Sequence, residues 1–323
     1  MKTMAHPSRN ARLARAFFLL ALATVAQPQA LADVRSFKDC PDCPLLVAIE
    51  PGSFVMGSAP NDADQAKDGR EAPAHPVRVE RRFALGRTEV SVGEFARFVA
   101  ATGHVTSAEA DATAPGCLAW LAQDHTLTAR PRLQWRAPGY AQRDDHPVVC
   151  VSWNDAQAYL AWLSQRAGHT YRLPSETEWE LAARAGTGTR WPWGNDPAQA
   201  CLHAKVADAT PHADGWQWPE RHDCSDGHPG VAPVGSYRAT ANGLHDMIGN
   251  VWEWVQDCYA ADAYARQDMP ADGSARELAG CTARGLRGGA WISGPGRTRP
   301  AYRGGYGPET RANVFGFRVA RSL

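Results

Sequence analysis

The sequence has no excess of charge of either sign and little that a membrane would accept. It contains 34 basic and 34 acidic residues among 323. A protein that binds nucleic acid or anionic lipid usually attracts it through net positive charge, so we expect no nucleic-acid partner. After the first thirty-odd residues, no apolar run approaches the roughly 20 residues that span a bilayer, and we expect no membrane span.

The common catalytic signatures are missing as well. The sequence has no Gly-x-Ser-x-Gly elbow, no phosphate-binding P-loop and no His-Glu-x-x-His metalloprotease motif. His75, His125, His146 and His169 stand singly in loop-like segments, where a histidine is usually exposed or hydrogen-bonded. These absences argue against a serine hydrolase, a nucleotide hydrolase and a zinc protease.

The N-terminus has the pattern of a secretory signal peptide. Four basic residues within the first 15 positions precede the apolar residues 16–23 and the small-residue site at 30–32. The alternative is an uncleaved anchor, but the apolar run is much shorter than the roughly 20 residues that a membrane helix needs. We therefore predict that residues 1–32 are removed before Asp33, and that the mature protein is periplasmic or secreted.

All eight cysteines follow that predicted cleavage site. An oxidising compartment converts paired thiols into disulfides, and pairing each cysteine with its neighbour keeps every loop local. For the first two, Cys-x-x-Cys, a redox dithiol is the competing interpretation, but this pair precedes an extended segment and not a helix. Zinc is disfavoured because no second Cys-x-x-Cys completes a site. The expected disulfides are Cys40–Cys43, Cys117–Cys150, Cys201–Cys224 and Cys258–Cys281.

The mature chain has the composition of a loop-rich single domain, residues 33–323, because it holds all 12 Trp, all 29 Gly and all but two of the 23 Pro of the sequence, without a fixed repeat. Capping boxes predict one helix from Ser91 to Gly103 and another from Ser175 to Ala185. Helical spacing predicts a third, opening at Asn154 and ending at Gly168. We expect strands at residues 45–49, 77–83 and 315–319, a mobile loop at 59–70, and a surface excursion at 116–150.

Short motifs are spread in order over nearly the whole mature chain. They are PGSFVMGS (51–58), EAPAHPV (71–77), TEVS (88–91), HPV (146–148), VSW (151–153), YRLPSETEWE (171–180), WGN (193–195), APVG (232–235), GNVWEW (249–254), RGG (287–289) and GFR (316–318). This ordered series resembles the formylglycine-generating enzyme (sulfatase-modifying factor) family, and so many segments in order are very improbable by chance. The resemblance implies a mixed α+β, irregular, loop-rich fold related to C-type lectin-like modules and stabilised by calcium and disulfides.

The resemblance also implies structural calcium. The matching ligand positions are the side chains of Asp246 and Glu253 with the carbonyls of Gly249 and Val251, a mixture of hard oxygens that calcium favours. The alternative is that both acids are solvated surface residues. For a second family site, Asp226 and the backbone of His228 match, but Lys205 stands where the family usually has Asn, and an ammonium has no lone pair to coordinate a metal. Loss or alteration of that second site is at least as well supported as its retention.

The departure from the family lies after Gly289. Formylglycine-generating enzymes bind copper there through two cysteines, and the matching positions here are Ser293 and Thr298. Copper(I) needs thiolate-type ligands, and no cysteine follows Cys281, so we do not expect copper. The histidine motif of the related sulfoxide synthases, His-x-x-x-His-x-Glu, is absent too. The remaining polar and aromatic groups predict a pocket for an anionic or peptide-like ligand, unless the arginines only satisfy core carbonyls and carboxylates. The pocket candidates are Trp252, Trp291, Ser293, Thr298 and Arg299, with Arg297, Arg303 and Glu309 nearby.

Three functions remain open at this stage. The first is an exported accessory or binding protein for a peptide, a small molecule or a partner protein. The second is a divergent enzyme that matures a peptide or metabolite, comparable to relatives associated with siderophore or cofactor maturation. The third is retained formylglycine generation, which the missing cysteines argue against. Fold alone does not choose among them.

Overall fold

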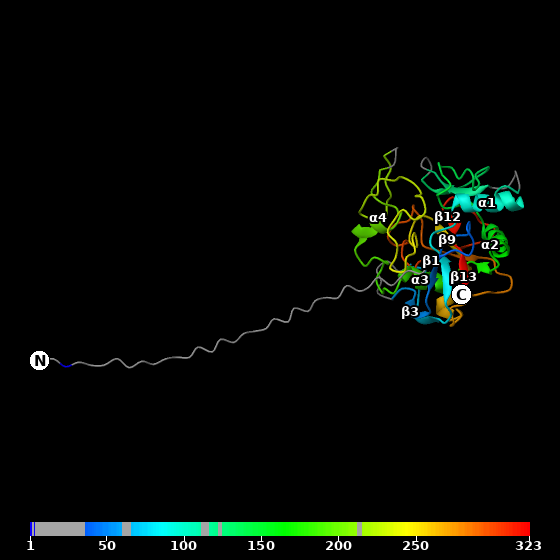
Figure 1. Cartoon of the computed structure of the whole chain (residues 1–323). Helices are drawn as coiled ribbons and strands as arrows, with labels where there is room; N and C mark the ends of the chain where they lie inside the picture. Colours follow the sequence, from blue (N-terminus) through cyan, green and yellow to red (C-terminus); the bar gives the residue numbers. More distant parts are fainter. Residues whose placement is uncertain (2, 4–35, 60–65, 111–115, 122–124, 212–214) are drawn as a thin grey trace. The chain divides into compact units, whose positions relative to one another are not determined.

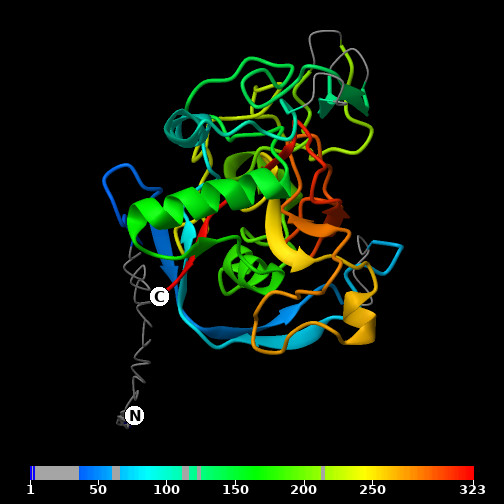
Figure 2. The same cartoon turned by 90° about the vertical axis from the view of Figure 1, so that its right-hand side faces the viewer.

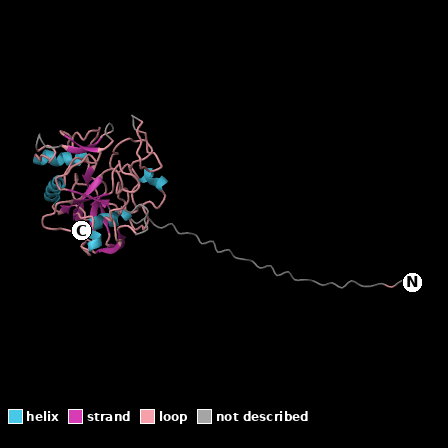
Figure 3. Cartoon of the chain, turned by 180° about the vertical axis from the view of Figure 1, so that it is seen from behind, coloured by secondary structure: helices cyan, strands magenta, loops and turns pink. Residues whose placement is uncertain are grey.

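Short strands and helices joined by long loops make up the structured part of the chain (Figures 1 and 3). Apart from residues 1 and 3, the computed structural model describes residues 36–59, 66–110, 116–121, 125–211 and 215–323. The predicted signal peptide falls outside these ranges and stays a prediction. Within them, no helix is both long and apolar enough to cross a bilayer.

Two sheets form the framework. In the first, five antiparallel strands run in the order β1-β2-β5-β13-β8: β1 (Ser36–Phe37), β2 (Leu46–Ile49), β5 (Phe83–Gly86), β8 (Tyr171–Arg172) and β13 (Ala320–Ser322). In the second, the order is β11-β10-β9-β12, and β9 and β12 are parallel: β9 (Trp252–Cys258), β10 (Arg284–Arg287), β11 (Arg303–Tyr306) and β12 (Phe315–Phe317). Two hairpins accompany them, β3 (Gly52–Met56) with β4 (His75–Val79) and β6 (Cys117–Trp120) with β7 (Leu127–Arg130).

Capping boxes open the three longer helices, α1 (Val92–Thr102), α2 (Trp153–Ala167) and α3 (Glu176–Arg184). The first and third begin and end as predicted. The second begins earlier than predicted, because Ser152 and Asp155 form the capping box in place of a cap at Asn154. Two single-turn helices also occur, α4 (Ala200–His203), which follows a 3₁₀ turn at Pro197–Gln199, and α5 (Ala263–Arg266).

Helix α2 ties the helical side of the molecule to the second sheet. It runs across the front of Figure 2 in green, with α1 packed against it. Its first residue, Trp153, donates from Nε1 to the carbonyl of Val255 in β9 at 3.0 Å. Strand β9 is therefore anchored from both sides, by its neighbours in the sheet and by α2.

Two strand predictions were wrong in their bounds. Residues 77–83 divide between β4 and β5, which belong to different sheets, and residues 315–319 contribute β12 and then leave the sheet before β13. Apolar residues alternate both before and after the point where the chain passes from one sheet to another. The periodicity alone therefore does not reveal where the chain changes sheets.

The segment 116–150 is also more than a surface excursion. Its described residues form the β6–β7 hairpin, and Trp120 and Trp135 are 5% and 2% exposed within the main hydrophobic cluster. A tryptophan side chain gains so much from burial that it enters the core even where the neighbouring residues show no periodic pattern. Of the predicted mobile loop at 59–70, residues 60–65 fall outside the described ranges.

The predicted disulfide pairing is confirmed. Each cysteine bonds to its neighbour in sequence, with Cα–Cα distances between 5.0 and 5.9 Å, and none of the eight is free. Disulfides of this kind persist in oxidising compartments, in keeping with an extracellular location.

Candidate functional site

The loop between β10 and β11 forms one wall of a cleft. It begins at Gly288 and Gly289, whose φ angles are 94° and 76°, in the left-handed region that favours glycine. A Cβ on Gly289 would lie 2.9 Å from the carbonyl oxygen of Arg297. The close return of the loop therefore requires glycine, and it brings Ser293 and Arg297 to the same cavity.

This cavity has a volume of about 460 Å³, and aromatic and aliphatic side chains line it together with two arginines and Ser293. Trp252 of β9 lies beside Tyr302, with ring centroids 5.7 Å apart. Arg70, Arg297 and Tyr302 also line an adjoining cavity of about 960 Å³. We call the two adjoining cavities the Ser293 cleft; it offers aromatic surface and guanidinium groups side by side.

The hydroxyls at the two predicted cysteine positions are both engaged inside the loop. Ser293 Oγ accepts a hydrogen bond from the Ala290 amide at 3.0 Å. Thr298 Oγ1 lies 2.9 Å from His222 Nε2 and donates to the Gly294 carbonyl at 3.1 Å. Burial lowers the pKa of His222 to about 4, so the imidazole is neutral at pH 7. Thr298 is fully buried and Ser293 is 4% exposed.

Of the five pocket residues predicted from the sequence, the structure brings only Trp252 and Ser293 to the cleft. Trp291 packs against Trp120, with ring centroids 5.1 Å apart, and lines a separate cavity of about 710 Å³. Thr298 is buried behind the loop.

Two of the other predicted polar residues, Arg299 and Arg303, are buried in the interior. Arg299 donates to both carboxylate oxygens of Glu71 at 2.8 Å, and both side chains are buried. Arg303 pairs with Glu176 of α3 at 2.6 Å. Glu309 is exposed and accepts a hydrogen bond from Ser107. Arg299 and Arg303 therefore follow the alternative prediction, in which the arginines pair with buried carboxylates in the core and do not bind a ligand.

Sequence reasoning missed Arg70 and Tyr302. Arg70 donates from Nη1 to the Arg303 carbonyl at 3.1 Å, and its guanidinium lies 5.4 Å from the centroid of the Tyr302 ring. It belongs to a segment read as a polar loop, and no local pattern indicates that such a loop returns to β11. Its ion pair with Asp68, two residues earlier, is a local contact that helps to orient the Arg70 side chain.

The predicted calcium ligands Asp246 and Glu253 differ in what surrounds them. Asp246 is 3% exposed, its Oδ2 accepts from the Gly235 amide at 2.6 Å, and its carboxyl group also hydrogen-bonds with that of Glu89. Burial raises the pKa of both carboxyl groups, which favours a proton between them. A carboxylate oxygen is a hard ligand of the kind that calcium favours, so the chemistry of Asp246 is compatible with the predicted role.

Glu253 is already occupied by protein donors. It forms a bidentate ion pair with Arg318, at 2.5 and 2.6 Å, and accepts a hydrogen bond from Trp179 Nε1 at 2.7 Å. A carboxylate with this many charge-assisted bonds has little to offer a metal. The ligand set implied by the resemblance thus fits at Asp246 and fits poorly at the Glu253 side chain; Gly249 and Val251 contribute only backbone oxygens to it.

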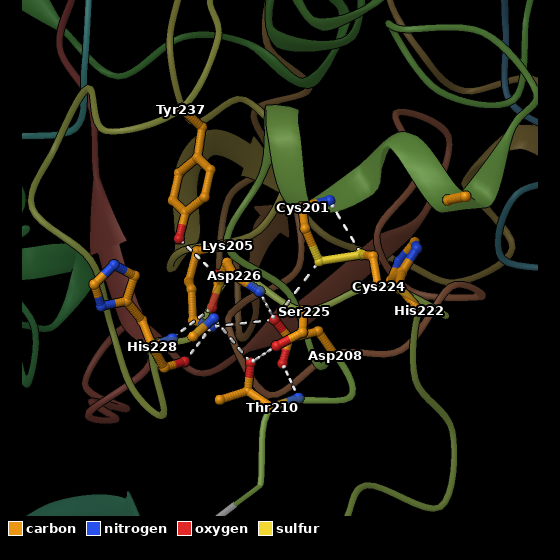
Figure 4. Close-up of a disulfide and its surroundings, with 12 residues drawn as sticks. Cys201, Lys205, Asp208, Thr210, His222, Cys224, Ser225, Asp226, His228 and Tyr237 are labelled. Atoms are coloured by element: carbon orange, nitrogen blue, oxygen red, sulfur yellow. Dashed lines mark hydrogen bonds and ion pairs between the residues drawn. A yellow bond between two sulfur atoms is a disulfide. The ribbon is translucent and has the colours of Figure 1, made fainter.

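At the second predicted site, an ammonium stands among the oxygens (Figure 4). Lys205 Nζ lies 3.0 and 2.9 Å from the two carboxylate oxygens of Asp226 and 2.6 Å from the His228 carbonyl. Asp208 Oδ2 is 3.8 Å away. Lys205 is 2% exposed. We call this group of oxygens around Lys205 Nζ the lysine cage.

The lysine cage is electrostatically satisfied. Although burial alone raises the pKa of Asp226, the Lys205 ammonium and the Tyr237 hydroxyl lower it below its usual value. Tyr237 donates to Asp226 Oδ2 at 2.6 Å, and the Asp226 amide donates to Asp208 at 3.0 Å. While the ammonium remains there, no space is left for a metal ion at this position.

Comparison with known proteins identifies the family. A model of the sulfatase-modifying factor enzyme 1-like domain matches residues 32–323. The chain belongs to this family. A formylglycine-generating enzyme from Thermomonospora curvata is 35% identical over 304 residues, which cover 85% of this chain and 92% of the relative. An inactive C-alpha-formylglycine-generating enzyme 2 from Mus musculus is 34% identical over 306 residues, 86% of each.

Among solved structures, the fold matches that of PvdO from Pseudomonas aeruginosa, with a TM-score of 0.72 and 34% identity over 90% of this chain and 98% of PvdO. The expected mixed, sheet-rich sulfatase-modifying-factor fold is thereby confirmed. Relatives of similar identity carry both active and inactive names, so family membership alone does not decide the chemistry of this sulfatase-modifying-factor domain.

Proposed function

We propose that this protein is an exported, ligand-binding member of the sulfatase-modifying factor family, and that the Ser293 cleft holds an anionic peptide or small molecule. The hydrogen bonds of Ser293 and Thr298 carry this proposal. In this chain, hydroxyl groups engaged by Ala290, Gly294 and His222 stand where the family's oxidases place thiolates. Copper(I) requires soft sulfur ligands, and neutral hydroxyls inside a loop do not supply them.

The cleft itself supports binding. A cavity of about 460 Å³ falls within the usual range of small-ligand pockets, in which a few polar groups set orientation. Trp252 and Tyr302 offer aromatic surface. Arg297 is exposed where the two cavities meet, and its planar guanidinium suits a carboxylate or phosphate. An aromatic or peptide ligand with an anionic group matches this arrangement.

One experiment tests the chemical half of the proposal. The purified protein is given one equivalent of copper(I) and a peptide with a cysteine in a sulfatase-type sequence. We expect no conversion of that cysteine to an aldehyde by mass spectrometry and no tight copper binding against a chromogenic chelator. Aldehyde formation with oxygen uptake would instead establish retained formylglycine generation, for which the 35% identity to a named formylglycine-generating enzyme argues.

A second experiment tests the binding half. Indole-3-acetate and a pentapeptide ending in tryptophan with a free carboxylate are titrated by calorimetry. We expect Arg297→Ala to weaken binding of either probe at least about tenfold, which corresponds to about 1.4 kcal/mol for a lost charge-assisted pair. Arg143→Ala, an exposed arginine outside the cleft lining, is the control. Equal binding by both variants would place the ligand elsewhere.

A further inference from the structure

A second cavity, of about 710 Å³, shares no lining residue with the Ser293 cleft. Its lining comes from segments that are distant in sequence, residues 120–121, 139–141, 210–211 and 227–231, together with Trp291. Its volume is within the usual range of small-ligand pockets. The function proposed for the Ser293 cleft makes no use of this space, which we call the Trp291 cavity.

One buried side chain, Asn313, holds the aromatic part of this lining in place. The Trp120 amide donates to Asn313 Oδ1 at 3.0 Å, and Asn313 Nδ2 donates to the carbonyls of Trp120 and Pro138 at 3.1 and 3.0 Å. Tyr140 Oη donates to the Asn313 carbonyl at 2.8 Å. The aromatic side chains are therefore fixed before a ligand arrives, which reduces the entropic cost of binding.

The lysine cage holds the segments that carry Thr210 and His228 (Figure 4). Lys205 Nζ donates to the His228 carbonyl at 2.6 Å, and the Thr210 amide donates to Asp208 Oδ1 at 2.9 Å. The Gly227 amide donates to Thr210 Oγ1 at 3.2 Å. These bonds join residues 210–211 to residues 227–231, so this part of the cavity is also built into the fold.

The lining is aromatic and carries no strong charge. Among the described residues that form it there is no carboxylate, ammonium or guanidinium group, and two prolines add flat apolar surface. The Trp291 ring meets the rings of Trp120 and Tyr140 edge to face, at interplanar angles of 87° and 88°. A charged ligand group would be buried here without a partner, which is costly. The cavity therefore suits a flat, uncharged ring.

One polar atom of this lining has no partner. Trp291 is 4% exposed, and its Nε1 makes no hydrogen bond within the part of the chain that the structure describes. A buried indole N–H normally finds an acceptor, because leaving it unpaired costs the full desolvation of the donor. The Tyr140 hydroxyl, in contrast, is already engaged by Asn313. A ligand oxygen would complete the one open hydrogen bond.

We propose that the Trp291 cavity binds an uncharged, planar aromatic molecule whose carbonyl oxygen accepts a hydrogen bond from Trp291 Nε1. The ring of the ligand packs against Trp120 and Tyr140, in the edge-to-face or offset arrangements that aromatic rings prefer, and the carbonyl sets its orientation. This ligand differs in charge and in place from the anionic ligand of the Ser293 cleft, so the proposal does not rest on that function. The protein then has two ligand sites of different chemistry.

Coumarin and naphthalene, two flat bicyclic molecules of nearly the same shape, separate the ring from the carbonyl. Each is titrated into the mature protein labelled with ¹⁵N at tryptophan, and the indole N–H signals are followed by NMR. The Trp291 signal is the one missing from Trp291→Phe. We expect coumarin to move it downfield and naphthalene to move it much less. Trp291→Phe should bind coumarin about tenfold more weakly, as expected for one lost hydrogen bond, and bind naphthalene as the parent does.

A second variant tests the location. Gly230 lines the cavity, and a Cβ there would meet no heavy atom within 4 Å, so Gly230→Leu fits and takes up the space of the ligand. Gly188→Leu, with the same free space outside the cavity, is the control. We expect Gly230→Leu to lose coumarin binding, and Gly188→Leu and Arg297→Ala to keep it.

Three results would overturn the proposal. The first is a parent protein that does not bind coumarin. The second is equal coumarin affinity in Trp291→Phe and the parent, or in Gly230→Leu and Gly188→Leu. The third is loss of coumarin binding in Arg297→Ala, which would place the molecule in the Ser293 cleft.

Discussion

The lysine cage and the buried carboxyl pair of Glu89 and Asp246, called here the Glu89–Asp246 centre, compensate buried negative charge in different ways. Both bury carboxylates in segments without regular secondary structure. In the first, the chain supplies its own cation, since Lys205 reaches both oxygens of Asp226. In the second, the carboxyl groups of Glu89 and Asp246 hydrogen-bond with each other, and burial raises the pKa of both. The difference shows that a buried acidic group is compensated by an ammonium in one place and by a proton in the other.

The two centres are also mechanically joined. The Lys205 carbonyl accepts a hydrogen bond from the Asn250 amide at 2.7 Å, and Asn250 in turn binds Glu89. A Cβ at Gly249 would lie only 2.1 Å from the Lys205 carbonyl oxygen. Glycine is thus required where the two segments meet, and Asn250 contacts both centres.

The largest expected effect comes from removing the built-in cation. Lys205→Met leaves Asp226 buried and unpaired, so we expect it to lower the free energy of unfolding by about 3–5 kcal/mol, measured by urea denaturation. Lys67→Met, an exposed lysine, should change it little. Adding Asp226→Asn to Lys205→Met should recover a large part of the loss. A single variant as stable as the parent would show that the cage is dispensable.

A smaller effect is expected from replacing the Lys205 ammonium in the lysine cage by an amide oxygen. Lys205→Asn replaces the ammonium by an amide oxygen beside Asp226 and the His228 carbonyl, which creates a set of hard oxygen ligands. Unfolding of this variant should become more calcium-dependent than that of the parent, with a further stabilisation of about 2.7 kcal/mol when calcium is 100 times its dissociation constant. Lys205→Met, which offers no oxygen, is the control. A calcium response identical to that of the parent would show that the amide oxygen, Asp226 and the His228 carbonyl do not form a calcium site.

The smallest expected effect concerns the outer part of the cage. Tyr237→Phe removes the hydroxyl that donates to Asp226 Oδ2 at 2.6 Å. Hydrogen bonds to charged groups contribute about 1.5–3 kcal/mol, and we expect a loss at the lower end because Lys205 still holds the carboxylate. Tyr306→Phe, at an exposed position, should have no measurable effect in the same denaturation experiment. If both variants lose the same amount, the Tyr237 hydroxyl has no special role.

Much of the fold could be predicted from local signals. The capping boxes at Ser91 and Ser175 place two helices correctly because a cap is a contact between residues three apart. The disulfides could be predicted for a similar reason, because each one joins two cysteines that follow one another in the sequence. The strand ends at residues 77–83 and 315–319 were misplaced because a change of sheet is decided by the partner strand, which lies elsewhere in the sequence.

The candidate site was predicted less completely. Trp252 and Ser293 were identified because they belong to the family motifs, and Asp246 for the same reason. Glu89 and Arg70 were missed as site residues, since their roles depend on partners more than 150 residues away in sequence. Arg299 was taken for a pocket residue because its charge is visible in the sequence, whereas its burial against Glu71 is not.

The amino-acid sequence by itself determined the family, the disulfide partners, the principal helices and the absence of cysteine after position 281. These depend on residue identity and on short separations along the chain. Only the tertiary structure decided which charges meet. It placed Lys205 among the oxygens of Asp226 and His228, paired Glu253 with Arg318, and brought the carboxyl groups of Glu89 and Asp246 together. The reason is that charge balance is set by distances across the fold, which the order of residues does not contain.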